Sequence, residues 1–430
     1  MSTKKSEDVF EKYALEAVPK ENRQSWPSIA LIWIGTMICV PALMMGGALI
    51  TGLNLVHALL AGVIGYTIVV IYMCFQGMQA ADLGRPTVSA AVPSFGFSGS
   101  RILISLILGI STLGWFGVQA NVCGAAFSSV LNTWLGVNFP VWISSLIWGL
   151  IMLSTAIIGF NAVKYLNYIA VPALIILSIY GTYSSFVKYG SSILSSYQPP
   201  TPFPFVQGIA LAVGTFAVGG VIAGDFSRYA RNRREAVLSS VWGVWPAGVA
   251  MLFMGSVMAL LAGTYDITQV MSALGAPVLG LIILILATWT TNTINAYSAG
   301  IALTNLFQLP DSKRALATAV AGILGTVLAV AGIMNYFLNF LTILTSTIPP
   351  VAGVMIADYW VKKKGDPSKW FRYPGANWVG ILSWLIGALV GIYLKIGIAP
   401  INAIIVSFVV YLVLISVVKQ PQPVPSKKKA

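Results

Sequence analysis

Apolar residues fill most of this chain in long runs that are separated by short polar turns. A helix needs about 20 mostly apolar residues to cross the hydrocarbon core of a bilayer, so each run predicts a membrane-spanning helix. The pattern predicts an all-α polytopic membrane protein with twelve transmembrane helices, at residues 28–52, 55–76, 101–131, 138–159, 163–187, 205–226, 236–263, 275–304, 315–333, 335–358, 376–396 and 399–418.

Composition agrees with this interpretation. The 430 residues are 57% hydrophobic and only 9% charged, whereas a soluble domain carries about 25% charged residues. Residues 1–27 are polar and have no apolar core before a cleavage site, so we expect no cleavable signal peptide. The first span is then expected to direct insertion, and residues 419–430 are expected to form a second tail.

The distribution of charge predicts the orientation of the chain. If the N-terminus is cytoplasmic, the cytoplasmic segments hold all of the 25 lysines and arginines except Lys188 and Lys395. This asymmetry is the positive-inside rule, and it supports an even number of spans in a plasma (inner) membrane with both termini cytoplasmic. The net charge of +13 therefore needs no nucleic-acid partner to explain it.

Few residues could support catalysis or a conventional metal site. Cys39, Cys74 and Cys123 lie in apolar segments without paired spacing, and His57 is the only histidine. Neither a disulfide framework nor a zinc site is predicted, and no nucleophile–base pair occurs in the spans. We therefore expect neither an enzyme nor an organic cofactor.

Two spans contain residues that weaken a helix. The sixth holds the glycine-rich stretch Gly214–Gly220, and the first holds Gly35 and, near mid-span, Pro41. Because unpaired backbone groups are costly in lipid, such breaks are tolerated where they line a cavity or are buried in protein. The two breaks lie five spans apart in opposite orientation, which an inverted repeat of five spans predicts at a transporter's binding site. For the first span alone, an ordinary proline kink is the alternative.

The third span offers a candidate surface for a flat ligand. Thr112, Trp115 and Gln119 are spaced i, i+3 and i+7, so they share one helical face. An indole plane beside an amide suits a planar heterocycle with donors and acceptors on its edge. A glutamine at mid-membrane needs a partner or a function, and contact between helices is the alternative.

The eighth span is rich in oxygen and amide groups. The stretch Ala287–Asn295 contains four threonines and two asparagines, and Ala287, Thr290, Thr291 and Asn295 share a face. Hydroxyls and freed carbonyls form an uncharged oxygen cage of the kind that hard cations prefer. Hydrogen bonding between helices is the alternative.

Acidic residues are scarce in the spans. Asp225 and Asp358 lie at cytoplasmic ends beside basic residues, so we expect them to be structural partners of arginines and lysines. A proton relay would require an acid or a histidine at depth, and its absence favours Na⁺ over H⁺ as the coupling ion.

These motifs resemble those of the nucleobase:cation symporter-1 family, particularly its cytosine permease (purine-cytosine permease) branch. The resemblance spans roughly residues 25–418, and it rests on Leu113-Gly-Trp-Phe-Gly117, Gly224-Asp-Phe-Ser-Arg228, Trp289-Thr-Thr-Asn292 and Ile348-Pro-Pro-Val-Ala-Gly-Val-Met-Ile-Ala-Asp-Tyr359.

The resemblance implies a five-plus-five inverted-repeat core at residues 28–358, with broken first and sixth helices, followed by two further helices at 359–418. It also implies that a base stacks between Trp115 and Phe216. Na⁺ would be held by backbone carbonyls of Gly35 and Ile38, by Ala287, and by the hydroxyls of Thr290 and Thr291.

Some positions differ from the cytosine branch. Thr112 stands where that branch has a glutamine, and Gln119 follows Trp115 by one turn, as in the hydantoin and purine branches. Val218 replaces a serine, and Ala287 replaces an asparagine of the ion site.

Together these patterns predict a secondary transporter that imports a nucleobase, with cytosine as first choice, by cation symport through alternating access. Thr215, Val218, Gly219, Asn292 and Asn295 complete the expected substrate site beside Thr112, Trp115, Gln119 and Phe216. The partners expected are the base, the cation and the bilayer, with a functional monomer. A symporter of a purine, hydantoin, hydroxymethylpyrimidine or amino acid, and proton-coupled uptake, remain alternatives. A channel would need a continuous polar pore lining, and here the polar groups cluster near one depth.

Overall fold

The computed structural model describes residues 17–158, 160–190, 192, 196–199, 201–260, 267–273 and 277–418. Residues 1–16 of the predicted N-terminal tail and the whole predicted C-terminal tail, 419–430, lie outside the described residues. Helices form nearly all the regular structure of the described part, where an isolated bridge joins Gln24 to Ala230.

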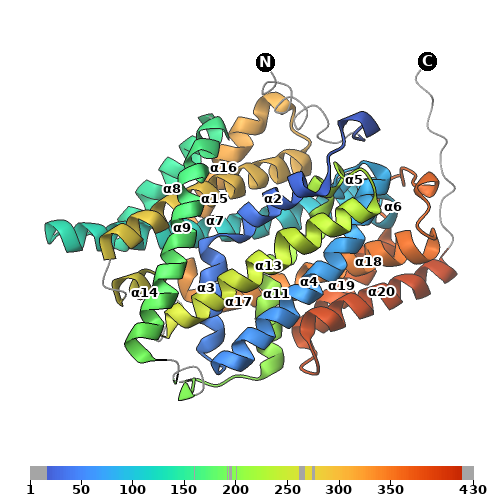
Figure 1. The fold of residues 1–430 in the computed structure, drawn as a ribbon. Coiled ribbons are helices and arrows are strands. Elements are labelled where there is room, and N and C mark those ends of the chain that lie inside the picture. Colours follow the sequence, from blue (N-terminus) through green and yellow to red (C-terminus); the bar gives the residue numbers. More distant parts are fainter. Residues whose placement is uncertain are drawn as a thin grey trace.

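The helices follow one another through the chain as shown in Figure 1. Their bounds are η1 Lys20–Asn22, α2 Trp26–Met37, α3 Val40–Ile50, α4 Leu55–Leu83, α5 Thr87–Ala90, α6 Val92–Phe95, α7 Phe97–Leu135, α8 Val141–Ile158, α9 Phe160–Tyr189, α11 Phe205–Val221, α12 Ala223–Ser227, α13 Arg233–Ala259, α14 Ile267–Ala273, α15 Pro277–Phe307, η2 Asp311–Lys313, α16 Arg314–Val330, η3 Ile333–Tyr336, α17 Phe337–Thr347, α18 Pro349–Ile356, η4 Ala357–Lys362, η5 Pro367–Lys369, α19 Trp378–Tyr393 and α20 Ala399–Val417.

The predicted spans correspond in order to these helices. Among the described residues, eight helical stretches are long and apolar enough to cross a membrane, and α2 with α3 forms a ninth span bent by 55°. Three shorter apolar helices, α8, α16 and α19, account for the remaining predicted spans. The multi-pass, all-α architecture is confirmed.

Helices from both halves of the chain combine into two groups. In the first group, α13 packs against α2, α3 and α4, and α11 packs against α4. In the second group, α15 packs along α7, and α16 packs against α7, α8 and α15. Each group thus contains early and late helices, as an inverted repeat requires. Helices α18, α19 and α20 pack together at one edge of the bundle, and α17, α18 and α20 contact α11 (Figure 1).

Glycines on α13 allow both halves of the broken first span to approach its backbone. A Cβ placed on Gly243 would come within 3.0 Å of the Ala30 carbonyl oxygen on α2. A Cβ placed on Gly255 would come within 2.1 Å of the Leu43 carbonyl oxygen on α3. On the α3 side, Gly46 is equally close to α13, where a Cβ would lie 2.1 Å from the Leu252 carbonyl oxygen.

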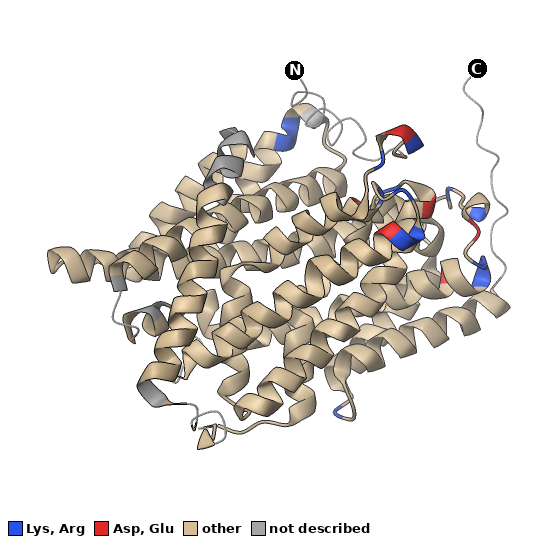
Figure 2. Ribbon diagram, in the orientation of Figure 1, with Lys and Arg blue, Asp and Glu red and all other residues tan. Residues whose placement is uncertain are grey.

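Charged residues gather at one end of the bundle (Figure 2). There Arg233 at the start of α13 forms an ion pair of 2.7 Å with Asp82 on α4, and the Tyr359 hydroxyl donates to the same carboxylate at 2.6 Å. These contacts join the end of α4 and the start of α13 to η4, where the tenth span finishes.

The expected role of Asp358 as a structural partner is confirmed. Its buried carboxylate pairs with Lys363 at 2.5 Å and accepts hydrogen bonds from Tyr411 on α20 and Ser94 on α6. Burial lowers the pKa of Lys363 from its ordinary value, and Asp358 opposes that shift. Charge attraction therefore helps to keep this lysine protonated inside the protein.

Asp225 has the expected arginine as an electrostatic neighbour, Arg228, and a backbone partner as well. Its carboxylate accepts the backbone N–H of Thr87 at 2.8 Å, and the Arg228 Nε–H donates to its backbone carbonyl at 3.1 Å. The carboxylate therefore caps the start of α5, a backbone role that residue type alone does not reveal.

The glycine contact between α3 and α13 yields a stability prediction. We expect Gly46→Ala to lower the thermal unfolding midpoint of the purified protein, because the new methyl group overlaps the Leu252 carbonyl and overpacking costs about 1–3 kcal/mol. Gly109→Ala is the matched control, since its Cβ would meet Ala302 at an ordinary 3.5 Å. Equal midpoints for the two variants would contradict this account of the packing.

Candidate functional site

The break in the first span releases two backbone carbonyls. Cys39 is extended, with φ −144° and ψ 159°, and its N–H donates to the Met37 carbonyl instead of that of Gly35. The Ala42 N–H donates to the Cys39 carbonyl instead of that of Ile38. The carbonyls of Gly35 and Ile38, both predicted ion ligands, therefore lose their usual helical donors.

The sixth span is broken by a kink that lies inside the predicted stretch Gly214–Gly220. Phe216 departs from helical geometry there (φ −125°, ψ 16°), and α11 then continues to Val221. The neighbouring glycines also provide close packing. A Cβ on Gly214 would lie 2.6 Å from the Leu341 carbonyl oxygen of α17, and one on Gly220 would lie 2.3 Å from the Tyr72 ring of α4.

The Phe216 side chain lies directly at this kink. Its ring is 9% exposed and meets Trp33 of α2 edge to face, with ring centroids 5.9 Å apart. The ring also covers Gly219, where a Cβ would come within 2.4 Å of it. Val218 is buried at 8% exposure, and the Thr215 hydroxyl donates to the Leu211 carbonyl at 3.3 Å.

Trp115 on α7 contacts a different set of rings. Its side chain is 8% exposed and meets Phe340 and Phe337 of α17 at centroid distances of 5.4 and 6.2 Å. Among the described residues, no ring contact joins Trp115 to Phe216, so stacking of a ligand between them stays a prediction. The Thr112 hydroxyl, one turn earlier, is satisfied by the Leu108 carbonyl at 2.7 Å.

Gln119 carries a buried acceptor without a partner. The side chain is 2% exposed, and its Oε1 makes no hydrogen bond. An unsatisfied buried acceptor costs about 1–3 kcal/mol, and such groups are rare in native proteins unless they serve a function or hold water. The predicted i, i+4 relation puts this oxygen one turn from the Trp115 ring.

The two asparagines of α15 have separate environments. Asn292 is fully buried, donates to the Phe116 carbonyl of α7 at 3.0 Å and accepts from the Asn295 amide at 3.2 Å. Its amide thus joins α15 to α7, which is the alternative considered for polar residues in this span. Asn295 is half-buried on the next turn, and its role in binding stays a prediction.

The predicted ion ligands of α15 form a compact oxygen cluster. The hydroxyls of Thr290 and Thr291 both donate to the Ala287 carbonyl, at 2.9 and 3.1 Å. A hydroxyl that donates its proton keeps two lone pairs, so both side-chain oxygens can still act as ligands. Helix α15 contacts α3, the second half of the broken span, but no hydrogen bond within the described residues joins this cluster to Gly35 or Ile38.

Three aromatic residues near the site were not anticipated. Trp33 supports the Phe216 ring, while Phe337 and Phe340 lie against Trp115. A signal for the last two was available, because their i, i+3 spacing puts them on one face of the tenth span. Trp33 precedes Gly35 by two residues, but its contact joins α2 to α11, which lie far apart in the sequence.

The chain is similar in sequence to known permeases. The pattern of a family described as permeases for cytosine/purines, uracil, thiamine and allantoin matches residues 17–416. A cytosine permease of Escherichia coli (strain K12) is 34% identical over 399 residues, covering 92% of this chain and 92% of that protein. A hydantoin permease of Microbacterium maritypicum is 28% identical over 402 residues, covering 84% of this chain and 80% of that protein.

Solved structures share the fold. The inward-facing conformation of Mhp1 gives a TM-score of 0.83 at 23% identity, covering 94% of this chain and 93% of that one. Mhp1, a nucleobase-cation-symport-1 family transporter, in a closed conformation with bromovinylhydantoin bound gives 0.77 at 21% identity, covering 93% and 94%. A Na⁺-coupled sialic acid symporter gives 0.65 at 8% identity, covering 97% and 93%. The predicted inverted-repeat fold is confirmed.

Stability measurements on the ligand-free protein can separate a binding residue from a packing residue. We expect Gln119→Leu to raise the unfolding midpoint or leave it unchanged, because it removes an unpaired buried oxygen that costs about 1–3 kcal/mol. Asn292→Leu should lower the midpoint, because it leaves the Phe116 carbonyl and the Asn295 amide without their partner.

Thermal unfolding of the two variants in the same detergent provides the comparison. A fall for Gln119→Leu as large as that for Asn292→Leu would mean that Gln119 is a packing residue.

Proposed function

The chain belongs to the family of permeases for cytosine/purines, uracil, thiamine and allantoin, and we propose that it imports a nucleobase or related planar heterocycle, cytosine first, by Na⁺ symport. The observation that carries this proposal is the buried Trp115–Gln119 face of α7, which combines a flat ring with an unpaired acceptor. A base offers a flat face for the ring and an edge N–H for the Gln119 oxygen.

The second wall of the proposed site is the kink in α11. Phe216 departs from helical geometry there, and its ring is held by Gly219 and Trp33. A base entering between Trp115 and Phe216 would meet two aromatic faces from different helix groups. The backbone from Thr215 to Gly219 and the amide of Asn295 would then read its edge.

The proposed cation lies between the first and eighth spans. Freed carbonyls of Gly35 and Ile38 supply oxygen ligands on one side, and the Ala287–Thr290–Thr291 cluster supplies them on the other. Both hydroxyls now donate to Ala287, so a cation would take their lone pairs and compete for the Ala287 carbonyl. Neutral oxygen ligands suit Na⁺, and the sialic acid symporter of similar fold is described as Na⁺-coupled.

Transport would follow from relative motion of the two helix groups. The base contacts one group through Phe216 and the other through Trp115, so occupancy couples their positions. Rocking of one group against the other around a central site is the general mechanism of inverted-repeat transporters. We further propose a ten-helix core at residues 28–358, two additional helices at 359–418, a functional monomer, and cytoplasmic termini in the plasma (inner) membrane.

A hydantoin is the second candidate substrate. A hydantoin permease is among the relatives, and Gln119 follows Trp115 by one helical turn, the arrangement that resembles the hydantoin branch. Val218 is buried near the kink and offers no hydrogen bond. A ligand that needs a hydroxyl at that position would be selected against, because a desolvated polar group would remain unpaired.

A thermal-shift panel tests the substrate and the ion together. We expect cytosine or a hydantoin to raise the unfolding midpoint more in Na⁺ than in K⁺, because a ligand stabilises in proportion to the logarithm of its concentration over Kd. Thr291→Val should remove most of the Na⁺ effect, since it deletes one proposed ligand. Thr293→Val is the matched control, because its hydroxyl also donates to a carbonyl four residues earlier, that of Trp289, at 2.9 Å.

Two results would contradict these assignments. No stabilisation by any base, purine or hydantoin in either salt would reject the substrate class. Equal loss of the Na⁺ effect in Thr291→Val and Thr293→Val would reject the placement of the ion.

The proposed stacking of the base on the Trp115 ring has its own test. We expect Trp115→Ala to reduce uptake of the labelled base in whole cells by roughly tenfold or more, because aromatic stacking on a base contributes about 1–3 kcal/mol. Trp134→Ala, at a ring that is 64% exposed, is the control and should transport normally at equal expression. Unchanged uptake by Trp115→Ala would exclude stacking on this ring.

A further inference from the structure

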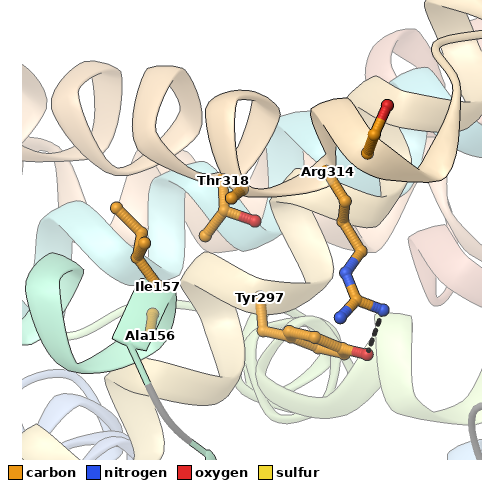
Figure 3. Close-up of a pocket in the computed structure, with 7 residues that line it drawn as sticks. Ala156, Ile157, Tyr297, Arg314 and Thr318 are labelled. Atoms are coloured by element: carbon orange, nitrogen blue, oxygen red, sulfur yellow. Dashed lines mark hydrogen bonds between the residues drawn. The ribbon is translucent and has the colours of Figure 1, made fainter.

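A cavity of about 150 Å³ lies between α8, α15 and α16, and none of its lining residues belongs to the proposed transport site. Ala156 and Ile157 line it from α8, Tyr297 from α15, and Arg314 and Thr318 from α16 (Figure 3). A cavity of this size holds far more than the single water that a small void accommodates. A group larger than one water can therefore fit among the lining residues.

The lining combines a cation with hydroxyl groups. Arg314 reaches from α16 onto the Tyr297 ring, with its Cζ 5.3 Å from the ring centroid, and its Nη1 donates to the Tyr297 hydroxyl at 3.3 Å (Figure 3). Ser312 and Thr318 add two hydroxyls to the lining. A planar guanidinium with hydroxyls around it is the donor set that phosphate oxygens prefer.

The charge of the segment before α16 supports the same preference. Arg314 is the first residue of α16 and directly follows η2, where the Lys313 N–H donates to the Pro310 carbonyl at 2.8 Å. The segment Asp311-Ser-Lys-Arg314 has one acid and two bases, a net charge of +1.

Packing keeps the cavity at the junction of the helices. A Cβ on Gly300 would lie 2.0 Å from the Thr318 hydroxyl, so this glycine of α15 lets α16 approach closely. Gly300 lies one turn beyond Tyr297, and the same α15 face therefore presents the ring to Arg314.

The surface beside the cavity is apolar. Ile157 lines the cavity and is 40% exposed, and Ile147 and Leu150 on the same face of α8 are 39% and 47% exposed. A ligand with a charged group in the cavity could thus lay hydrocarbon along α8. This favours a lipid headgroup over a free anion, because basic pockets between membrane helices bind anionic headgroups.

We propose that the Arg314–Tyr297 cavity binds a phosphate-type anion, supplied by the headgroup of an anionic phospholipid whose acyl chains follow the exposed face of α8. The site is distinct from the proposed transport site, so its occupancy affects stability and lipid preference without changing which substrate is recognised.

The test uses the full-length protein in nanodiscs of phosphatidylcholine with or without phosphatidylglycerol. We expect phosphatidylglycerol to raise the unfolding midpoint of the wild type, and Arg314→Gln to bind it roughly tenfold more weakly, because one charge-assisted contact is lost. Arg231→Gln is the matched control, because it removes the same charge from an exposed residue that directly precedes Asn232, the N-cap of α13. Ala156→Phe fills the cavity without changing charge, and it should also suppress the effect.

Native mass spectrometry of retained lipid gives a second measurement that does not depend on unfolding. The second arm of the test adds inorganic phosphate to the protein in lipid-free detergent. A rise in the unfolding midpoint that depends on Arg314 would support the anion site with a soluble anion as its source. No change in the midpoint would support the lipid headgroup as the source. Equal loss of phosphatidylglycerol binding in Arg314→Gln and Arg231→Gln, or full binding by Arg314→Gln, would overturn the proposal.

Discussion

The absence of water from the hydrocarbon core is the constraint on which the rest of this structure depends. Every backbone N–H and C=O that crosses the bilayer must find a partner inside the protein, so a chain can leave the helix only where protein or a ligand replaces the lost bonds. The break at Ile38–Cys39 is such a place. Its freed carbonyls would raise the free energy of the protein if they faced lipid, because they would lack hydrogen-bond donors. The same carbonyls can act as cation ligands, which connects the break to its proposed function.

The same constraint explains how well the sequence predicted the fold. Apolar run length was sufficient to place the spans in order, because it follows directly from transfer into lipid. The orientation that the lysine and arginine pattern indicates stays a prediction. The bend between α2 and α3 was also predictable, since Pro41 removes a donor. The residue at which the sixth span breaks was not predictable. Glycines at 214 and 220 flank the kink at Phe216, and they also serve as contacts for α17 and α4, two roles that composition cannot distinguish.

The sequence predicts the candidate site at the level of residue type and helical face, and the binding roles stay predictions. The structure shows Trp115 and Gln119 buried on α7 and the hydroxyls of Thr290 and Thr291 hydrogen-bonded to the Ala287 carbonyl within α15. The use of Asn292 as a contact to α7 could not be read from the sequence, because an asparagine offers the same groups to a ligand and to a neighbouring helix. Partners that depend on the angle between helices, such as Trp33 with Phe216, were likewise out of reach.

Helix α13 carries none of the predicted ion ligands, yet it helps to determine the shape of the proposed ion site. Gly243 contacts α2 and Gly255 contacts α3, on either side of the break. The two half-helices therefore rest on one template, and their relative angle cannot change unless a contact with that template is lost. A remote helix thus preorganises the freed carbonyls, so that a cation would meet ligands already held apart from each other and would pay little to order them. The requirement for glycine at positions 243 and 255 of α13 would then come from the geometry of the ion site, although neither residue touches the ion.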